Sequence, residues 1–532
     1  MKNFAKLLLI SWAAILAGCT TKGTNWDIDA YAPVAETTLD LTKLIGDNNI
    51  QSMTDSALWL NVDADVFTFS IDTLADFSSF SNVYDYSWPY FTTSIPGGTA
   101  LTPINIPITF ANSSVSLREI KFNKGILTLN IRALNQQRIR FTYNIPAATK
   151  NGNPFTFTDT LPGLQPGQDT VRYSVDLDLS DYTLVTTGPA NDQFNTFSPN
   201  IVLETIAGDP NTDLVYNALL FSLRSDLNNV ELVYGKGYLG QFNLTQNQLD
   251  ADLEMMRSFT SGAVDIEQLS LNLIIHNTIG ADLRFKPMSL VVKNTNQNTT
   301  LSLIHPQMGQ TANINRAFET GNPLNPVNAT LYTYSFNSGN SNIESLVELL
   351  PDKIEFSGDA KLNPNGNLGG NTDFYYPGYP AKIQMQLQAP LKFKIDQLTF
   401  VDTLDNPFAN LDIMDNVTDG EFIIRAENKF PLEMKLQVFT LDNQGAITDS
   451  VLVNDIITAA LLNSFNRVEN PVNTDLHAPV DAAKIYNLKN ASKIKIKAML
   501  NTLPSSSGRL QMYSDYYLKI KLIGDIKYHV VL

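Results

Sequence analysis

The amino-acid sequence predicts a mainly β protein, built from tandem antiparallel β-sandwich domains or extended curved-sheet domains with a few short helices. Three observations lead to this fold class. Apolar and polar residues alternate with period two along many segments, helical spacing is limited to short stretches, and one strand–bend–strand pattern recurs. Strands with one apolar and one polar face favour antiparallel sheets that keep one side in water.

The alternation runs through most of the chain. Val171–Leu179 places Val, Tyr, Val, Leu and Leu at every second position, and Leu391–Ile395 and Tyr517–Leu522 follow the same rule. Each of these segments has the length of an ordinary strand. We therefore expect strands from the first third of the chain to its end.

Helical spacing is found in three short segments, 243–256, 342–350 and 455–465. The first follows Thr245 as a candidate cap, and the second ends before Pro351. These lengths predict connectors rather than a helical layer. The chain also lacks the regular strand–helix alternation that builds a doubly wound nucleotide-binding sheet.

A repeated pattern is the main sign of internal organisation. Each copy runs as an apolar strand, an Asn, a large apolar residue, and a second alternating strand. The copies are Leu127–Phe141, Leu271–Phe285 and Phe422–Leu436. Their central residues are Asn135, Asn277 and Asn428, and Asn tolerates the backbone angles of a sharp bend. The repeat predicts three β-units that each break one strand at an Asn.

The break at Asn428–Leu432, followed by a strand and the turn Asp442–Gly445, resembles the core of late-embryogenesis-type (water-stress) β-sandwich domains. The same break is similar to one in uncharacterised Bacteroidota outer-membrane lipoproteins. The resemblance implies an immunoglobulin-like sandwich or the curved sheets of lipid-transfer proteins. It implies no catalytic residue.

The N-terminus has the pattern of a lipoprotein signal peptide. Lys2 and Lys6 precede an apolar run that ends at Leu16, and Leu16–Gly18 leads directly to Cys19. The run is too short to span a membrane as a helix. Small residues before a cysteine fit a lipoprotein peptidase, which predicts cleavage before Cys19 and acylation of its thiol.

Cys19 is the only cysteine of the chain, so the mature protein forms no internal disulfide. Several acyl chains on one residue give nearly permanent attachment, because each buried methylene contributes about 0.8 kcal/mol. The predicted partner of Cys19 is therefore a membrane. We expect the outer membrane, with the protein on its periplasmic face and exposure at the cell surface as the alternative.

Composition limits the remaining classes of partner. The chain is 43% hydrophobic and 17% charged, with a formal net charge of −16. A strongly acidic protein lacks the basic face that nucleic acids require, so no nucleic-acid partner is expected. A protein or lipid partner in the envelope is expected instead.

The domain boundaries follow from the anchor and from polar stretches. Gly321–Ala329 and Pro351 are the strongest candidates for domain edges. The predicted order is a signal peptide at 1–18, a lipidated tether at 19–30, an N-terminal β domain at 31–255, a middle β domain at 256–350 and a C-terminal β domain at 351–532.

No catalytic motif is recognisable. The chain has no nucleophile elbow, phosphate-binding loop or dinucleotide glycine pattern, and its four histidines have no metal-ligand spacing. Carboxylates near strand ends, such as Asp176 and Asp178, predict solvated turns, with calcium as the minor alternative. We expect no catalytic residue, no resident metal and no cofactor.

One loop, Asn363–Pro380, stands out because flexible Asn and Gly residues lead into clustered aromatics. Phe374, Tyr375, Tyr376 and Tyr379 predict a contact surface for protein, glycan or lipid. The alternative is a long hairpin whose aromatic rings fold back onto the sheet.

Three functions fit these observations. The first is a non-enzymatic binding or scaffold lipoprotein of the cell envelope. The second is a lipid carrier whose sheets enclose an apolar tunnel. The third is a surface lipoprotein that binds glycans.

Overall fold

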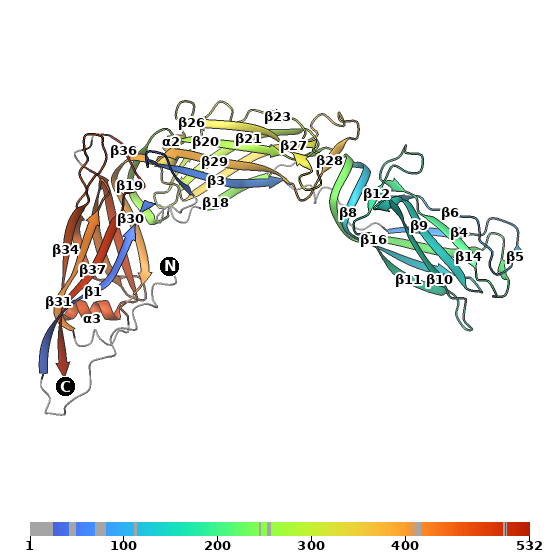
Figure 1. Cartoon of the computed structure of the whole chain (residues 1–532), viewed down its shortest axis with the longest axis horizontal. Coiled ribbons are helices and arrows are strands. Elements are labelled where there is room, and N and C mark those ends of the chain that lie inside the picture. Colours follow the sequence, from blue (N-terminus) through green and yellow to red (C-terminus); the bar gives the residue numbers. More distant parts are fainter. Residues whose placement is uncertain are drawn as a thin grey trace.

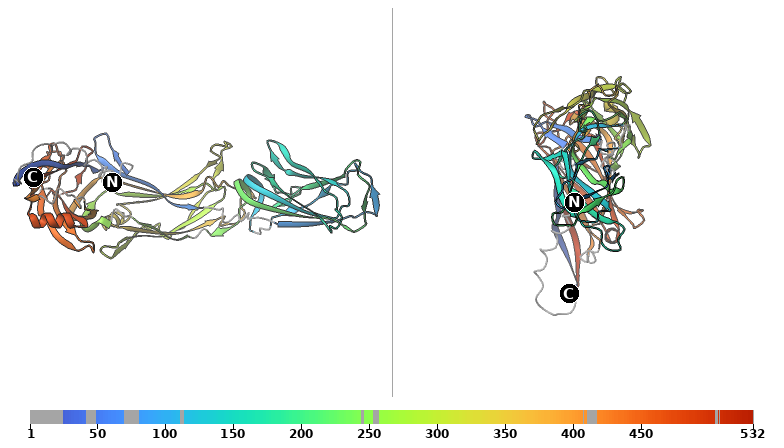
Figure 2. Two further views of the ribbon diagram at one scale, coloured as in Figure 1. Left: turned by 90° about the horizontal axis from the view of Figure 1, so that it is seen from below. Right: turned by 90° about the vertical axis from the view of Figure 1, so that its right-hand side faces the viewer.

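A computed structural model describes residues 25–41, 49–69, 81–110, 114–243, 246–252, 257–406, 408–409, 417–503, 506 and 508–531. These residues form three β-sandwiches in a curved row (Figure 1). We name them the proximal, middle and distal domains, and the proximal domain holds both the first and the last described strands. Figure 2 shows the same row along its length and from its distal end. The predicted mainly β fold with antiparallel sandwiches is confirmed.

The proximal domain packs a four-stranded sheet against a six-stranded sheet around its own core. The first sheet has the order β1 (Asn25–Leu39), β37 (Leu518–Val531), β31 (Val417–Asn428), β34 (Val472–Val480). The second has the order β19 (Phe259–Ile266), β30 (Lys392–Asp405), β35 (Lys493–Thr502), β32 (Leu432–Leu441), β33 (Ile447–Ile457), with β36 (Leu510–Gln511) beside β30. The helix α3 (Ala482–Asn490) connects β34 to β35.

The middle domain has the same two-layer plan. Its first sheet has the order β2 (Ile50–Ser52), β3 (Leu58–Phe69), β29 (Ala381–Pro390), β20 (Ser270–Asn277), β26 (Thr330–Asn337). Its second sheet contains β17 (Phe242–Asn243), β18 (Gln246–Asp252), β27 (Lys353–Leu362), β21 (Leu283–Asn294), β22 (Thr299–Ser302) and β23 (Ala312–Ile314). The short pair β24 (Phe318–Glu319) and β25 (Val327–Asn328) and the helix α2 (Ile343–Glu348) complete it.

In the distal domain the two layers are joined into one curled sheet, because β12 pairs with a strand of each layer. Its main path is β28 (Asp373–Tyr375), β16 (Leu219–Tyr238), β8 (Ser116–Ala133), β12 (Thr183–Val185), β9 (Ile139–Lys150), β14 (Asn200–Thr205), β6 (Ile104–Asn105). The strands beside this path are β4 (Ser81–Ser87), β10 (Asn153–Leu161) and β11 (Val171–Asp178). Two small pairs are β5 (Thr93–Ile95) with β15 (Thr212–Leu214) and β7 (Ile108–Thr109) with β13 (Thr196–Phe197).

All three domains repeat one topology of eight strands. When the core strands of a domain are numbered in chain order, one layer has the order first, eighth, third, sixth, and the other has the order second, seventh, fourth, fifth. In the proximal domain these layers are β1-β37-β31-β34 and β30-β35-β32-β33. In the middle domain they are β3-β29-β20-β26 and β18-β27-β21-β22, and in the distal domain β4-β16-β8-β11 and β6-β14-β9-β10. The protein therefore contains three copies of one eight-stranded topology.

The three copies are nested rather than consecutive. In the distal domain the connection from the first core strand, β4, to the second, β6, contains only the short strand β5. In the middle domain the same connection, from β3 to β18, contains the whole of the distal core. In the proximal domain the connection from β1 to β30 contains the middle and distal domains together. Each inserted domain thus occupies the first connection of the domain that carries it.

This nesting differs from the predicted consecutive domains 31–255, 256–350 and 351–532. The reason is that the first strand of each sandwich pairs with its last strand, as β1 does with β37 and β3 does with β29. Strands near the N-terminus therefore complete domains whose other strands lie near the C-terminus. Only the distal core comes from one continuous stretch of chain.

The recurrent Asn marks the same place in every domain, between the third and fourth strands. Asn277 is fully buried, and its Nδ2 donates hydrogen bonds to the carbonyls of Ala281 (3.0 Å) and Asn315 (2.9 Å). Its Oδ1 accepts from the backbone N–H of Ile279 at 3.1 Å. The side chain thereby satisfies backbone groups where the chain leaves one sheet for the other.

Asn428 makes the same set of contacts in the proximal domain. Its Nδ2 donates to the carbonyls of Leu432 (3.0 Å) and Thr458 (2.9 Å), and its Oδ1 accepts from Phe430 N–H at 2.9 Å. In the distal domain Asn135 Nδ2 also donates to two carbonyls, but its buried Oδ1 has no hydrogen-bond partner among the described residues. The structure therefore confirms the repeat and shows that its third copy is less complete.

The helix predictions are confirmed in one of three cases. The segment 342–350 contains α2. The described residues of the segment 243–256 instead belong to β17 and β18 at the edge of the second middle sheet, where pairing with β27 overrides the local helical spacing. The predicted cap, Thr245, lies outside the described residues. The segment 455–465 completes β33 and then continues without a helix. The helix α3 was not predicted, although Asp481 caps it by accepting a hydrogen bond from Lys484 N–H.

Among the described residues, no helix is long and apolar enough to cross a membrane.

Replacing the buried Asn tests the role of the bends. We expect Asn277→Ala to destabilise the middle domain by about 2–3 kcal/mol, because it leaves buried backbone groups without partners. Asn135→Ala should cost the distal domain less, because that side chain accepts no hydrogen bond. The measurement is native-state hydrogen exchange of β20 and β8, which reports each domain separately.

The control for this test is Asn272→Ala on the same strand, since Asn272 is half-buried on β20. A change within about 0.5 kcal/mol is expected for a side chain in this position. Equal effects of Asn272→Ala and Asn277→Ala would contradict a special role for the bend.

Candidate functional site

The predicted lipid-attachment residue, Cys19, lies outside the described residues. The first described strand, β1, begins at Asn25, shortly after Cys19 in the sequence, and pairs along its length with β37. β1 thus begins inside the predicted tether 19–30, and pairing with β37 makes residues 25–30 strand instead of linker. The described part of the protein that is nearest to Cys19 in sequence is therefore the proximal domain. The distal domain lies at the other end of the row (Figure 1).

The four aromatic residues predicted as a contact loop lie at the joint between the middle and distal domains. Phe374, Tyr375 and Tyr376 are 6%, 4% and 9% exposed, and Tyr379 is half-buried. β28, which contains the first two, pairs with the end of β16 and adds an edge strand to the distal sheet. The rings fold back into the protein, so the structure corrects the interpretation of this loop as an open contact surface.

The buried rings connect two domains. Tyr376 of the middle domain lies against Tyr234 of β16, with ring centroids 5.4 Å apart, and against Phe374 at 5.9 Å. The Tyr376 hydroxyl donates to Glu319 Oε1 at 2.5 Å, and Glu319 forms an ion pair with Lys236 of β16 at 2.8 Å. Burial and the bond to Glu319 raise the pKa of Tyr376. These contacts attach the end of β16 to the middle domain.

A buried carboxylate supports the same joint. Asp373 is 2% exposed and accepts hydrogen bonds from Asn363 Nδ2 at 2.7 Å, Leu239 N–H at 3.2 Å and Arg316 Nη2 at 3.3 Å. Burial raises the pKa of Asp373, against the opposing effect of these three donors. Leu239 directly follows β16, so this carboxylate joins the distal strand to loops of the middle domain.

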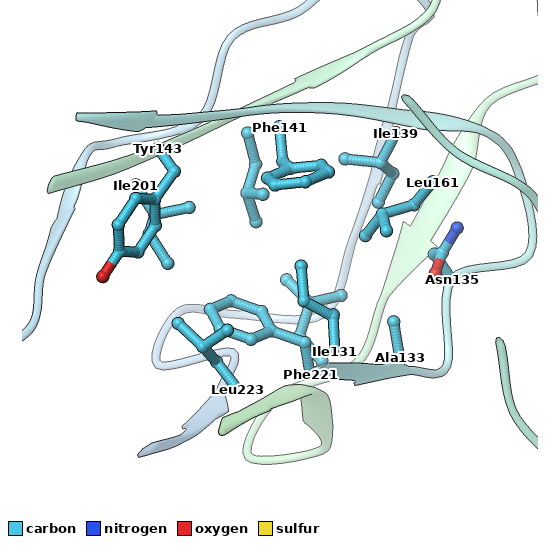
Figure 3. A pocket seen from close by; sticks show the side chains of 12 residues that line it. Ile131, Ala133, Asn135, Ile139, Phe141, Tyr143, Leu161, Ile201, Phe221 and Leu223 are labelled. Carbon is cyan, nitrogen blue, oxygen red and sulfur yellow. The ribbon is translucent and has the colours of Figure 1, made fainter. Parts of the chain in front are cut away.

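The interior of the distal sandwich contains a small apolar cavity of about 20 Å³ (Figure 3). Ile139 and Phe141 line it from one layer, and Ile131 and Phe221 line it from the other. A cavity of this volume holds about one water molecule. As formed, it is far too small for an acyl chain.

The end of the distal domain that faces away from the joint carries a larger, polar hollow of about 520 Å³, which we call the tip hollow. It lies where β8 ends and β11 begins, beside the loop that connects β10 to β11. Its lining residues are Arg132, Pro162, Gly163, Gln165, Gln168, Asp169, Thr170, Val171 and Arg172.

Exposed aromatic residues lie at the same end of the domain, in the segments that follow β4 and precede β16. Tyr90 is 50% exposed, Phe91 is 90% exposed and Tyr216 is 62% exposed. Trp88 holds this group in place, because its ring contacts Tyr90 at 5.0 Å and its Nε1–H donates to the Phe91 carbonyl at 3.1 Å. We call Tyr90, Phe91 and Tyr216 the tip aromatic cluster.

Three of the four histidines contact a neighbouring side chain. His276 is hydrogen-bonded to Gln384 Oε1 at 2.8 Å, and His477 lies 3.1 Å from Glu421 Oε2. His305 contacts the ring of Phe336. In the part of the chain that the structure describes, no group of three or more His, Cys, Asp or Glu side chains is placed to hold a metal ion.

Sequence reasoning missed the residues of the tip. Arg132 and Arg172 belong to two segments that were correctly predicted as strands, but their juxtaposition depends on the pairing register of β8 and β11. The available signal was weak: each Arg lies on the polar face of an alternating strand next to its end. Trp88, Tyr90 and Phe91 lie close together in the sequence, but only the fold shows that Tyr90 and Phe91 are exposed at this end of the domain.

Comparison with known proteins adds little. No protein-family model matches the chain, and no curated protein matches it. The solved structures include a similar protein from Parabacteroides distasonis that is described as secreted. It shares 12% sequence identity, and the match covers 54% of this chain and 89% of that one, with a TM-score of 0.25.

Asp373→Ala tests the joint between the middle and distal domains. The change leaves Leu239 N–H and Asn363 Nδ2 without their acceptor, and hydrogen bonds to a charged group contribute about 1.5–3 kcal/mol. We expect amide exchange of residues 235–239 to become roughly tenfold faster or more. Hydrogen exchange with mass spectrometry measures it.

Asp359→Ala is the matched control, because Asp359 is exposed on β27 of the same domain. It should leave exchange in this segment unchanged. If Asp373→Ala also leaves it unchanged, the carboxylate does not hold the joint.

Proposed function

We propose that this protein is a membrane-anchored, non-enzymatic binding lipoprotein of the cell envelope that presents its distal domain away from the membrane. The observation that carries the proposal is the nested topology. It places β1, the first described strand after Cys19, in the proximal domain, and it places the tip of the distal domain at the far end of the row (Figure 2).

The joints support a spacer role. β28 of the middle chain segment extends the distal sheet, and β19 extends the second sheet of the proximal domain in the same way. Arg509 of the proximal domain adds ion pairs to Asp265 (2.7 Å) and Glu267 (2.8 Å) on the segment that contains β19. Shared strands and ion pairs at both joints favour a semi-rigid rod over freely jointed domains.

The lipid-carrier alternative receives less support from the geometry. The apolar cavity of the distal domain would have to open greatly to accept an acyl chain, because its present volume is about 20 Å³. The exposed features at the tip are polar and aromatic instead. We therefore place the proposed binding surface at the tip.

Replacing the predicted lipidated residue tests the anchor. In a Gram-negative host that expresses the full chain, Cys19→Ala should abolish incorporation of labelled fatty acid and move the protein from the membrane fraction to the soluble fraction. The physical reason is the loss of acyl chains whose burial provides the attachment. Fractionation and fatty-acid labelling measure the two effects.

Thr20→Ala keeps the thiol and should behave as the unchanged protein does. Persistence of Cys19→Ala in the outer membrane, with label attached, would disprove the proposed anchor. Protease added to intact cells then distinguishes the two faces: a protected protein is expected for the periplasmic face, and a released protein would place it on the cell surface.

A further inference from the structure

The tip hollow contains two adjacent arginines that form no ion pair with any described residue. Arg132 of β8 and Arg172 of β11 are directly paired across the antiparallel strands. Side chains of such a pair lie on the same face, with Cβ atoms about 5 Å apart. Like charges in this position destabilise a sheet unless something neutralises them.

The other arginines nearby are neutralised within the protein. Arg138 forms a 2.6 Å ion pair with Asp209, and Arg140 forms a 3.1 Å ion pair with Glu204. For Arg132 and Arg172 no hydrogen bond or ion pair from the side chain is found among the described residues. Both side chains are exposed and line the hollow, so their donors are available to a ligand.

The nearby acidic side chains do not neutralise the positive charges of Arg132 and Arg172. Arg132 of β8 pairs with Ser222 of β16, and Ser222 pairs in turn with Asp85 of β4. Asp85 is therefore two strand spacings, or about 10 Å, from Arg132. Asp169 also lines the hollow, but no ion pair between it and either arginine is found among the described residues. Two adjacent guanidinium groups in a chain of net charge −16 therefore form a local positive site.

The chemistry of the hollow narrows the class of anion. Guanidinium groups bind carboxylates through paired hydrogen bonds. Gln165, Gln168 and Thr170 add neutral donors and acceptors of the kind that hydroxyl groups need. At about 520 Å³, the hollow is within the size range of small-molecule sites and is larger than a single inorganic ion requires.

The tip aromatic cluster lies at the opposite edge of the same layer. Because the order of this layer is β4-β16-β8-β11, β4 lies about 10 Å, or two strand spacings, from Arg132 on β8 and about 14 Å, or three spacings, from Arg172 on β11. A short oligosaccharide has this reach, and its apolar ring faces pack on exposed aromatic side chains. An extended ligand can thus use both features.

We propose that the tip hollow binds a carboxylate-bearing saccharide, with Arg132 and Arg172 holding the carboxylate. The inference deepens the proposed binding function by naming the class of ligand and its site. It does not depend on the anchor, because the mature chain expressed without its lipid presents the same tip. Failure of binding would leave the anchoring experiment unaffected.

The test is isothermal titration calorimetry of the mature, unlipidated chain with a galacturonate trimer. The neutral galactose trimer and sodium sulfate serve as comparison ligands.

Arg132→Gln and Arg172→Gln should each weaken binding of the acidic trimer roughly tenfold, because each removes charge-assisted hydrogen bonds. Asp169→Asn should strengthen it about two- to threefold, because it removes a nearby like charge from the ligand's surroundings. Binding should weaken as salt is raised.

Arg118→Gln is the matched control. Arg118 is exposed on the same strand, β8, but near the joint, so the substitution changes net charge equally without touching the hollow. Co-sedimentation with isolated cell-wall sacculi forms a second arm, which distinguishes carboxylates of the wall polymer from those of soluble polysaccharide.

Binding in either arm that is lost in Arg132→Gln and Arg172→Gln and kept in Arg118→Gln supports the proposal and identifies the source. Equal effects of all three substitutions, equal binding of the neutral trimer, or sulfate binding as tight as that of the acidic trimer would overturn it. Absence of binding in both arms would overturn it as well.

Discussion

The pairing of the first strand of each domain with its last strand is the constraint on which the whole architecture depends. β1 pairs with β37, β3 with β29 and β4 with β16. A sandwich built this way is closed only when the chain has returned to its starting edge. Any insertion into the first connection must therefore bring the chain back to where it left. Nesting satisfies this requirement, because each inserted domain itself begins and ends on neighbouring strands.

The buried Asn residues solve a second problem that the same topology creates. Between its third and fourth strands each domain turns out of one layer and into the other, where the backbone ladder is interrupted. Asn277 and Asn428 replace the missing ladder bonds with two donated hydrogen bonds and one accepted bond each. An amide side chain suits this position because it supplies both donors and an acceptor without a charge to desolvate.

Much of the fold could be predicted from the sequence, because strand alternation and the Asn-centred break are local patterns. The nesting could not, since nothing local connects 25–39 with 518–531. The aromatic loop shows the same limit at the scale of side chains. An Asn- and Gly-rich segment before Phe374 and Tyr376 fits an exposed loop and a buried joint equally well, and only the neighbouring strand β16 decides between them. The Arg132–Arg172 pair depends on a register that alternation does not specify.

Nesting also favours one order of assembly. Closing a flexible loop costs free energy that grows with the logarithm of its length, about 0.6 kcal/mol for each doubling. The distal core is continuous in sequence, so it closes without waiting for another domain. β4 begins opposite Asp226 of β16, and β16 ends at the joint. A folded distal domain therefore fixes the separation between the two ends of its segment, and the long connection from β3 to β18 then acts as a shorter one. The completed middle domain shortens the connection from β1 to β30 in the same way. Entropy therefore favours folding from the tip towards the tether, with the pairing of β1 and β37 as the last and most distant closure.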